Sequence, residues 1–191
     1  ILNNEEFTGI SIMKMEEGID SGPVYAMSKA KIDNKYVEEL HDELSIMGGE
    51  LLISTIDKIE NEGLEPIVQE HDMSTYAPII NKSDGKIDFN ESSEFIQRKI
   101  LAFNAWPGAY ANLNDKTYKF FKSDTVETDI KAENGEIIEI SDSITIKCSK
   151  GAIKVSEIKA QGKKRMKVSE FVKGNQLKKG MRFNERRESC F

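Results

Sequence analysis

Asp20 is the residue whose surroundings in the sequence most suggest chemistry. It stands in a short loop bracketed by Gly18 and Gly22, after a stretch with the apolar alternation of a strand. The glycines predict backbone angles that other residues resist, and Pro23 fixes the exit into a second strand. A carboxylate on such a loop can act in catalysis, but the spacing also fits an ordinary turn aspartate, which is the simpler interpretation.

A second group of residues could bind an anionic partner. Four positive charges fall within five residues, at Lys163, Lys164, Arg165 and Lys167. Clustered lysines and arginines displace counterions from a nucleic-acid backbone, so the cluster predicts contacts with phosphates. A solvated charged loop is the alternative interpretation, and both stay open at this point.

The charges are distributed unevenly along the 191 residues. The net charge is −6, yet residues 1–84 carry 6 Lys/Arg against 18 Asp/Glu, and residues 85–191 carry 21 against 15. An acidic first part and a basic second part predict two domains with different partners. The basic part is where an anionic partner such as nucleic acid is expected.

Composition excludes several classes of protein. A content of 38% hydrophobic and 31% charged residues is typical of a globular protein, and no apolar run is long enough to span a bilayer. Cys148 and Cys190 are too few for a disulfide framework and predict free thiols. No Cys/His cluster has zinc spacing, and His41 and His71 are expected at the surface. We therefore expect no metal site and no membrane span.

The elements expected around Asp20 are two strands and a long helix. The second strand is predicted over residues 24–32. Apolar positions three or four apart then predict a helix over residues 36–61 that ends at Gly63. Inside it, Gly48-Gly49 predicts close packing against a neighbour. Residues 1–6 are predicted to be the end of an earlier helix.

Farther along, the pattern predicts a small β-rich domain. A helix is expected over residues 92–103, and five short strands between 109 and 158 suggest a small antiparallel barrel, with Asn114-Asp115 as a hairpin turn. A short helix is expected to end at Gly174. Trp106 is predicted to fill the core, with a stacking site as the alternative.

The loop that carries Asp20 also resembles a known family. The run from Gly9 to Pro23 is similar to the aspartate loop of the folate-dependent formyltransferases. In that family, the aspartate of the G-[IL]-D-[ST]-G segment works beside an asparagine and a histidine from an upstream N-x-H segment. Asp20 matches the aspartate, whereas nothing here matches the other two. We therefore expect this chain to be the later part of a longer protein.

Three further segments resemble the methionyl-tRNA formyltransferase family, in the same order along the chain. They are residues 76–89, residues 102–110 and residues 161–174. The second departs from the family pattern at Ala105, where proline is frequent. With the aspartate loop, these motifs extend the resemblance over nearly the whole chain.

The resemblance implies an α/β plus β fold. Residues 1–63 would be the end of a Rossmann-like formyltransferase domain and residues 64–84 a linker. Residues 85–184 would form an OB-like β-barrel C-terminal domain, and residues 185–191 a flexible tail.

The resemblance also implies a function. The family transfers a formyl group from 10-formyltetrahydrofolate to the amino group of initiator methionyl-tRNA in translation initiation. Asp20 would be the catalytic residue, and Gly18 and Ile19 would line the folate donor beside it. The four charges of the basic cluster would contact tRNA. The protein would be a cytoplasmic monomer without a metal, and this chain alone is expected to be inactive.

Two alternatives remain open. A sugar-nucleotide N-formyltransferase would share the Asp20 loop but use another acceptor, and the basic end argues against it. A non-catalytic RNA-binding barrel with a vestigial first part is the other. An N-x-H segment upstream would indicate an enzyme.

Overall fold

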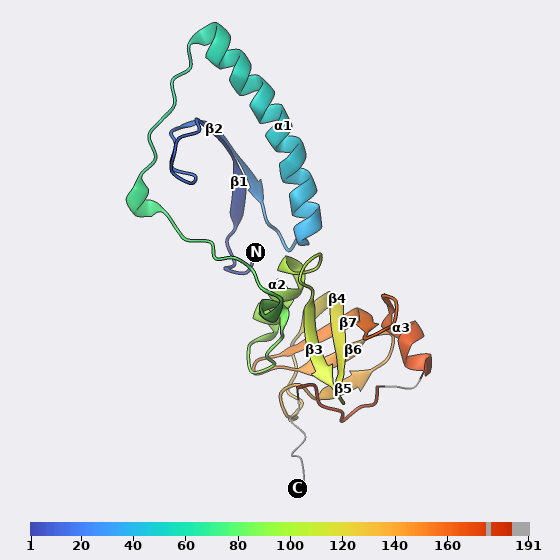
Figure 1. The fold of residues 1–191 in the computed structure, drawn as a ribbon. Helices are drawn as coiled ribbons and strands as arrows, with labels where there is room; N and C mark the ends of the chain where they lie inside the picture. Colours follow the sequence, from blue (N-terminus) through green and yellow to red (C-terminus); the bar gives the residue numbers. More distant parts are fainter. Residues whose placement is uncertain (175–176, 185–191) are drawn as a thin grey trace. The chain divides into compact units, whose positions relative to one another are not determined.

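The structure, a computed structural model, describes residues 1–174 and 177–184 (Figure 1). It divides into two compact units. Residues 4–79 form one, called here the N-terminal unit, and the chain from residue 80 onward, with residues 1–3, forms the C-terminal unit. The linker boundaries at residues 63 and 84 stay predictions.

The N-terminal unit begins with an antiparallel hairpin. Strands β1 (Phe7–Met13) and β2 (Val24–Lys31) pair along their length, with a register shift at the end of β1. Both predicted strands are therefore confirmed. The prediction of a helix end over residues 1–6 is wrong, because no helix is assigned there and Asn4 adopts a φ of 60°, which a right-handed helix does not contain.

Helix α1 (Val37–Glu62) follows the hairpin and confirms the predicted long helix. It ends at Gly63, whose φ of 66° is left-handed and whose N–H donates to the carbonyl of Lys58. This is the usual reason for glycine after a helix, since other residues resist that conformation.

Only one face of α1 packs on the hairpin. Leu40 and Thr55 are buried there, whereas the apolar Ile56 is 46% exposed. The glycines do not mark close packing. A Cβ atom at Gly48 would meet Ile10 at an ordinary 3.6 Å, and one at Gly49 would meet nothing within 4 Å.

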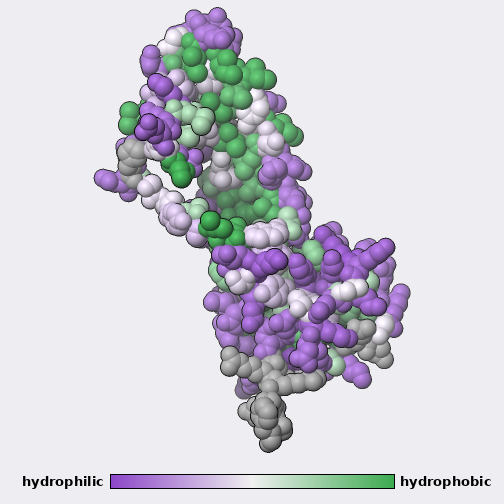
Figure 2. All heavy atoms as spheres, in the orientation of Figure 1, coloured by the Kyte–Doolittle hydropathy of each residue, from purple (hydrophilic) through white to green (hydrophobic). Residues whose placement is uncertain are grey.

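The other face of α1 is apolar and uncovered. Figure 2 shows hydrophobic side chains gathered over the N-terminal unit, whereas the visible face of the C-terminal unit is mostly hydrophilic. The exposed apolar side chains of the helix are those of Ile46, Leu52, Ile53 and Ile56. Their spacing of three, four and seven residues places them on one stripe. The short 3₁₀ turn η1 (His71–Met73) lies later in the same unit.

The C-terminal unit is built on a six-stranded antiparallel sheet in the order β3-β4-β7-β6-β5, with β8 paired to β7. Asn114 and Asp115 form the predicted hairpin turn, with φ values of 49° and 61°, as a type I′ turn requires. The strands are β3 (Ala109–Leu113), β4 (Lys116–Val126), β5 (Ile137–Ile140), β6 (Ile144–Lys147), β7 (Ala152–Ala160) and β8 (Met166–Lys167).

Three short helical segments and one longer helix accompany the sheet. Ser92 caps α2 by accepting a hydrogen bond from the Phe95 N–H at 3.2 Å, so the predicted helix of residues 92–103 is confirmed. The elements are η2 (Lys82–Gly85), α2 (Ser93–Ala102), α3 (Val168–Phe171) and η3 (Val172–Gly174). Across the described residues, no helix has the length and apolar character to cross a membrane.

The core of the C-terminal unit lies between the sheet and α2. Phe120, Ile153 and Ile96 are fully buried. Phe183 contacts this core from the end of the described chain, with its ring centroid 5.4 Å from that of Phe120 in an edge-to-face arrangement.

The predicted barrel does not close within the described residues, because β3 and β5 are not paired to each other. Residues 180–184 contact both edges instead. The Ile137 N–H of β5 donates to the Met181 carbonyl at 2.8 Å, and the Asn184 N–H donates to the Asn112 carbonyl of β3 at 2.7 Å. The C-terminal segment thus satisfies the two edges that a closed barrel would pair. The predicted tail of residues 185–191 lies outside the described residues.

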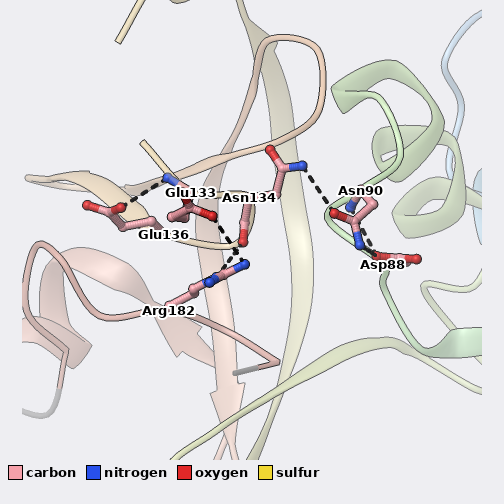
Figure 3. A network of polar contacts seen from close by, with 6 residues as sticks. All are labelled: Asp88, Asn90, Glu133, Asn134, Glu136 and Arg182. Carbon is pink, nitrogen blue, oxygen red and sulfur yellow. Dashed lines mark hydrogen bonds and ion pairs between the residues drawn. The ribbon is translucent and has the colours of Figure 1, made fainter. Parts of the chain in front are cut away.

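A network of polar contacts includes Arg182 of this C-terminal segment (Figure 3). The Arg182 Nε donates to the Asn134 carbonyl at 3.0 Å, and the Asn134 side chain donates to the Asn90 Oδ1 at 3.1 Å. Asn90 in turn donates to the Asp88 carboxylate at 2.9 Å. The network therefore connects the C-terminal segment to the residues that precede α2.

Candidate functional site

The loop that carries Asp20 joins β1 to β2 and is closed at its base. The Lys14 N–H donates to the Pro23 carbonyl at 2.9 Å, directly after the last residue of β1. Gly22 is buried there, and a Cβ atom on it would come within 1.8 Å of the Lys14 carbonyl oxygen. Only glycine allows the two sides of the loop to approach this closely.

The glycines have a different role from the predicted one. Gly18 and Gly22 do not adopt positive φ, so unusual backbone angles are not the reason for them. A Cβ atom at Gly18 would lie 2.3 Å from the Ser21 Oγ, the end of a side chain that can rotate away, so close approach is a strict reason for glycine only at Gly22. The positive φ belongs to Asp20 itself, at 53°, a conformation that aspartate tolerates better than most residues.

A residue that the sequence analysis missed holds this loop. The Gln69 Nε2 donates to the carbonyl of Asp20 at 2.9 Å and to that of Gly22 at 2.6 Å. Gln69 is 49 residues away from Asp20 in the chain, and no local pattern connects the two. The isolated bridge between Val24 and Ile67 brings the two segments together.

The loop presents its side chains outward. Asp20 and Gly18 are exposed, and Ile19 is 95% exposed. Among the described residues, no group of three or more His, Cys, Asp or Glu could hold a metal ion. His41 is a surface residue of α1, as predicted, with its Nδ1 3.6 Å from the Asp42 Oδ1.

The predicted basic cluster lies between β7 and α3. Lys163, Lys164, Arg165 and Lys167 are all exposed. Gly162 begins the segment with a φ of 73° after the end of β7. The turn thus places the four charges together at the edge of the sheet where β8 pairs with β7.

Arg165 differs from the three lysines because its guanidinium already has partners. The Arg165 Nε lies 2.7 Å from the Glu157 carboxylate, and its Cζ lies 4.2 Å from the centroid of the Phe121 ring. The Lys122 Nζ contacts the same carboxylate at 3.3 Å. This arrangement makes Arg165 an anchor for the segment.

Burial and the two positively charged partners of Glu157 shift the pKa of its carboxyl in opposite directions. Partial burial raises its pKa, but the hydrogen bonds and charges of Arg165 and Lys122 outweigh that effect. The net result is a pKa below the ordinary value of 4.5, so the carboxylate is ionised at neutral pH and its two partners stay fixed.

The lysines have no such partner. Within the described residues, the Nζ atoms of Lys163, Lys164 and Lys167 make no hydrogen bond or ion pair. Lys159 of β7, which pairs in register with Lys119 of β4, is also exposed and has no side-chain partner within the described residues. Lys119 turns away to donate to the Pro107 carbonyl at 2.7 Å, which lowers the repulsion between the pair. Within the described residues, unpaired ammonium groups therefore lie on strands β7 and β8 and on the turn between them.

Trp106 does not fill the core. Its side chain is 53% exposed, and the neighbouring Phe103, at 3%, is buried instead. Pro107 and Gly108 are buried as well. The turn therefore packs its smaller residues against the unit, and the indole of Trp106 remains at the surface. The prediction of a core tryptophan is wrong, and the stacking alternative remains available.

Cys148 is a free, fully buried cysteine. Burial raises the pKa of its thiol to about 12. It is therefore an inert core residue, as the expectation of a free thiol implies, and Cys190 lies outside the described residues.

The chain matches known protein families along most of its length. Residues 79–176 match the family described as "Formyl transferase, C-terminal domain". A "Methionyl-tRNA formyltransferase" of Magnetococcus marinus is 37% identical over 187 residues, which is 97% of this chain and 59% of that protein. A protein of the same name from Dictyoglomus turgidum is 40% identical over 96% of the chain and 60% of its own length. The chain thus spans about three fifths of the curated relatives that it matches.

Solved structures share the fold. The HypX protein of Aquifex aeolicus in complex with tetrahydrofolic acid matches with a TM-score of 0.69 and 18% identity, over 97% of this chain and 35% of that one. An N-formyltransferase of Helicobacter canadensis, in complex with folinic acid and dTDP-3-aminofucose, matches with a TM-score of 0.64 and 24% identity, over 81% and 56%. The match to HypX covers nearly the whole chain, so the hairpin and α1 are part of the fold shared with that protein.

Proposed function

The chain belongs to the formyltransferase family through its C-terminal domain, and on this premise we propose that it is the later part of a methionyl-tRNA formyltransferase. The observation that carries the proposal is the 33–40% identity to curated proteins of that name, which covers 93–97% of this chain in the relatives compared. The protein would transfer a formyl group from 10-formyltetrahydrofolate to the amino group of initiator methionyl-tRNA. As a translation enzyme, it would act in the cytoplasm as a monomer.

Asp20 would be the catalytic residue of this chain. The attacking amine must be neutral, and the formyl oxygen gains negative charge in the tetrahedral intermediate. The proton of the amine must leave as the bond to the folate breaks. A carboxylate at Asp20 would orient the family's upstream histidine and raise the pKa of that imidazole by favouring its charged form.

The same loop would contribute to binding of the folate donor. Gly18 and Ile19 precede Asp20, and the Ile19 side chain is almost fully exposed, so its apolar surface is available to a flat ring. Donor binding beside Asp20 would place the formyl group within reach of the carboxylate and its histidine.

The N-terminal unit would be the end of a larger Rossmann-like domain. The uncovered stripe of α1, with Ile53 at 74% exposure, and the open space at Gly49 support this proposal. Sheets of that architecture carry helices on both faces, and a helix apolar on two sides belongs between two layers. The residues that cover the stripe would come from the part of the domain that carries the catalytic asparagine and histidine.

The unpaired lysines of the C-terminal unit would contact the phosphates of tRNA. Lys163, Lys164 and Lys167 support this proposal because nothing within the described residues neutralises them. Arg165 and Lys122 share the single negative charge of Glu157, so the group keeps a net positive charge with which Arg165 would contact tRNA. Arg165 would also hold the segment in place through its bond to Glu157.

Replacement of Asp20 in the full-length protein tests the catalytic proposal. We expect Asp20→Asn to lower kcat for formyl transfer at least about a hundredfold, with a much smaller change in tRNA affinity. Asp42→Asn, which changes an exposed carboxylate of α1, is the matched control and should leave both unchanged. A near-normal kcat for Asp20→Asn would mean that Asp20 is an ordinary turn residue.

The salt dependence of binding tests the acceptor. Lys163, Lys164 and Lys167 changed together to Gln should weaken binding of tRNA to the chain. The slope of log affinity against log salt should fall by roughly 2–3 units, somewhat under one per lost contact. The control changes Lys29, Lys31 and Lys58 of the N-terminal unit, which are exposed lysines of equal total charge. An equal effect of both sets would indicate general charge attraction without a defined surface.

The two alternatives give different results in the same titration. A sugar-nucleotide N-formyltransferase should show no tRNA binding to lose, and dTDP-amino sugars should be formylated by the full-length protein. A non-catalytic RNA-binding protein should bind tRNA but show no transfer, whatever residue stands at position 20.

A further inference from the structure

The side chain of Gln69 uses both hydrogens of its amide nitrogen on the Asp20 loop. The Nε2 atom lies 2.9 Å from the carbonyl oxygen of Asp20 and 2.6 Å from that of Gly22. These two carbonyls lie on either side of Ser21. One side chain therefore fixes the backbone immediately after the proposed catalytic carboxylate.

The position of Gln69 is itself well defined. Two hydrogen bonds of 2.8 Å join Val24 and Ile67, each N–H donating to the carbonyl of the other residue. Gln69 follows two positions later, so this bridge brings its side chain within reach of the loop. It is half-buried, while the neighbouring Val68 and Glu70 are exposed. The segment after α1 thus adds to the edge of β2 and directs the amide into the loop.

The loop needs this support because its own hydrogen bonds end at its base. The Lys14–Pro23 bond closes the base, and the tip is where Asp20 adopts its left-handed φ of 53°. The left-handed conformation costs free energy even for aspartate, although less than for most residues, so contacts from the surroundings help to maintain it. Both hydrogen bonds from Gln69 require an N–H donor, so the carboxylate of a glutamate, which is of the same size, could not make them.

We propose that Gln69 is a positioning residue for Asp20, and this inference rests on the proposed function. By fixing the carbonyls of Asp20 and Gly22, it sets the direction in which the carboxylate leaves the loop. Transfer requires that carboxylate at a defined place, and a displacement of about 1 Å can cost a hundredfold in rate. Gln69 would not touch either substrate, so its loss should change kcat and leave tRNA affinity unchanged.

The first test measures the loop without any catalysis. In the 191-residue chain, the backbone ¹⁵N order parameters of Ser21 and Gly22 report motion on the picosecond to nanosecond timescale. We expect values of about 0.8 in the natural chain and below about 0.6 in Gln69→Glu. Gln69→Glu keeps the size but replaces donors by oxygens that repel the carbonyls. Gln69→Ala should have a smaller effect in the same direction and serves if the first variant does not fold.

The second test measures transfer in the full-length protein. Gln69→Glu should lower kcat by about tenfold to a hundredfold, with an unchanged KM for tRNA. Asn61→Ala is the matched control, because Asn61 is an amide of the same unit that bonds only to Asp57, at 2.8 Å on the surface of α1. It should change neither the order parameters of the loop nor kcat.

The outcomes separate this inference from the function on which it rests. Unchanged order parameters in both Gln69 variants would overturn the idea that Gln69 holds the loop. A loosened loop with normal kcat, while Asp20→Asn is inactive, would overturn the positioning role alone. A normal kcat for Asp20→Asn would overturn the catalytic role of Asp20 and the positioning role together. Loosening of the loop with a fall in kcat at unchanged KM would support the inference.

Discussion

The two units of this protein form their helices and strands equally well but bury very different amounts of apolar surface. In the C-terminal unit, residues such as Phe120 and Ile153 are fully buried between the sheet and α2. In the N-terminal unit, the buried apolar side chains are only those of Ala30, Ile32 and Leu40, and large residues such as Ile53 remain exposed. Capping and periodicity are therefore enough to define an element, whereas a core requires a second layer to pack against it.

The same difference separates the two candidate sites. The basic surface lies on a unit with a complete core, so its lysines can be changed without loss of the fold. The Asp20 loop lies on a unit that has few buried apolar side chains, and single long-range contacts such as that of Gln69 hold it. The following predictions test this contrast, beginning with the largest expected effect.

The largest expected effect is preferential proteolysis of residues 70–80, near the boundary of the two units, over the sheet of the C-terminal unit. Residues 70–80 are exposed in all described side chains, and few backbone hydrogen bonds hold them. Opening there should cost almost nothing, whereas cleavage inside the sheet requires unfolding of the C-terminal unit. Limited proteolysis with mass spectrometry should find the first cuts between Leu64 and Asn90, concentrated in residues 70–80. First cuts within residues 109–158 would mean that the C-terminal unit is less stable than its packing implies.

A matched pair of isoleucines compares the two units directly. Ile153→Ala removes a fully buried side chain and should cost about 2–5 kcal/mol of the free energy of unfolding, because a cavity remains. Ile53→Ala removes one that is 74% exposed and should cost no more than about 0.5 kcal/mol. Urea unfolding of the chain, followed by circular dichroism, measures both. Similar losses would show that Ile53 is covered in solution, for example by self-association.

Trp106 is a large exposed side chain within the well-packed C-terminal unit. Because 53% of the side chain is exposed, Trp106→Ala should destabilise the C-terminal unit by about 1 kcal/mol, well below a core aromatic residue. Its fluorescence should be quenched readily by iodide in the folded chain. A loss of more than about 3 kcal/mol, or a protected indole, would restore the prediction of a core tryptophan.

Glu157 should give the smallest effect, and one that depends on pH. Its pKa is lower in the folded than in the unfolded chain, so its stabilising contribution is present above the unfolded value and is lost as the pH falls through the folded value. Glu157→Gln should therefore cost about 0.2–1 kcal/mol at pH 7 and nearly nothing at an acidic pH that lies below the folded pKa of Glu157. Urea unfolding at both pH values provides the measurement. A difference that persists at the lower pH would assign the effect to packing.

Much of the local structure was predictable from the sequence. Helix α1 with its end at Gly63, helix α2 with its cap at Ser92, and the hairpin turn at Asn114-Asp115 all follow from residues within a few positions of each other. The exception is residues 1–6, a segment too short for its apolar pattern to decide.

The contacts across the sheet were not predictable. The sequence suggested a closed barrel, but β5 has only four residues, and its edge is met by residues 180–184 instead of by β3. Thr55 of α1 is buried whereas its apolar neighbour Ile56 is exposed, and the Thr55 hydroxyl donates to the Leu51 carbonyl of the same helix at 2.6 Å. Neither the contact at the edge of β5 nor the burial of Thr55 is indicated by the spacing of residues in the sequence.

The candidate sites divide in the same way. The sequence by itself determined which residues carry charge and where the loop of Asp20 and the basic cluster lie, because these depend on composition and on turns formed by near neighbours. Only the tertiary structure decided that Gln69 holds the Asp20 loop, that Glu157 engages Arg165, and that Lys159 pairs in register with Lys119. Those contacts join residues that are far apart in the chain or lie on different strands, and a single sequence records neither the distance nor the burial that creates them.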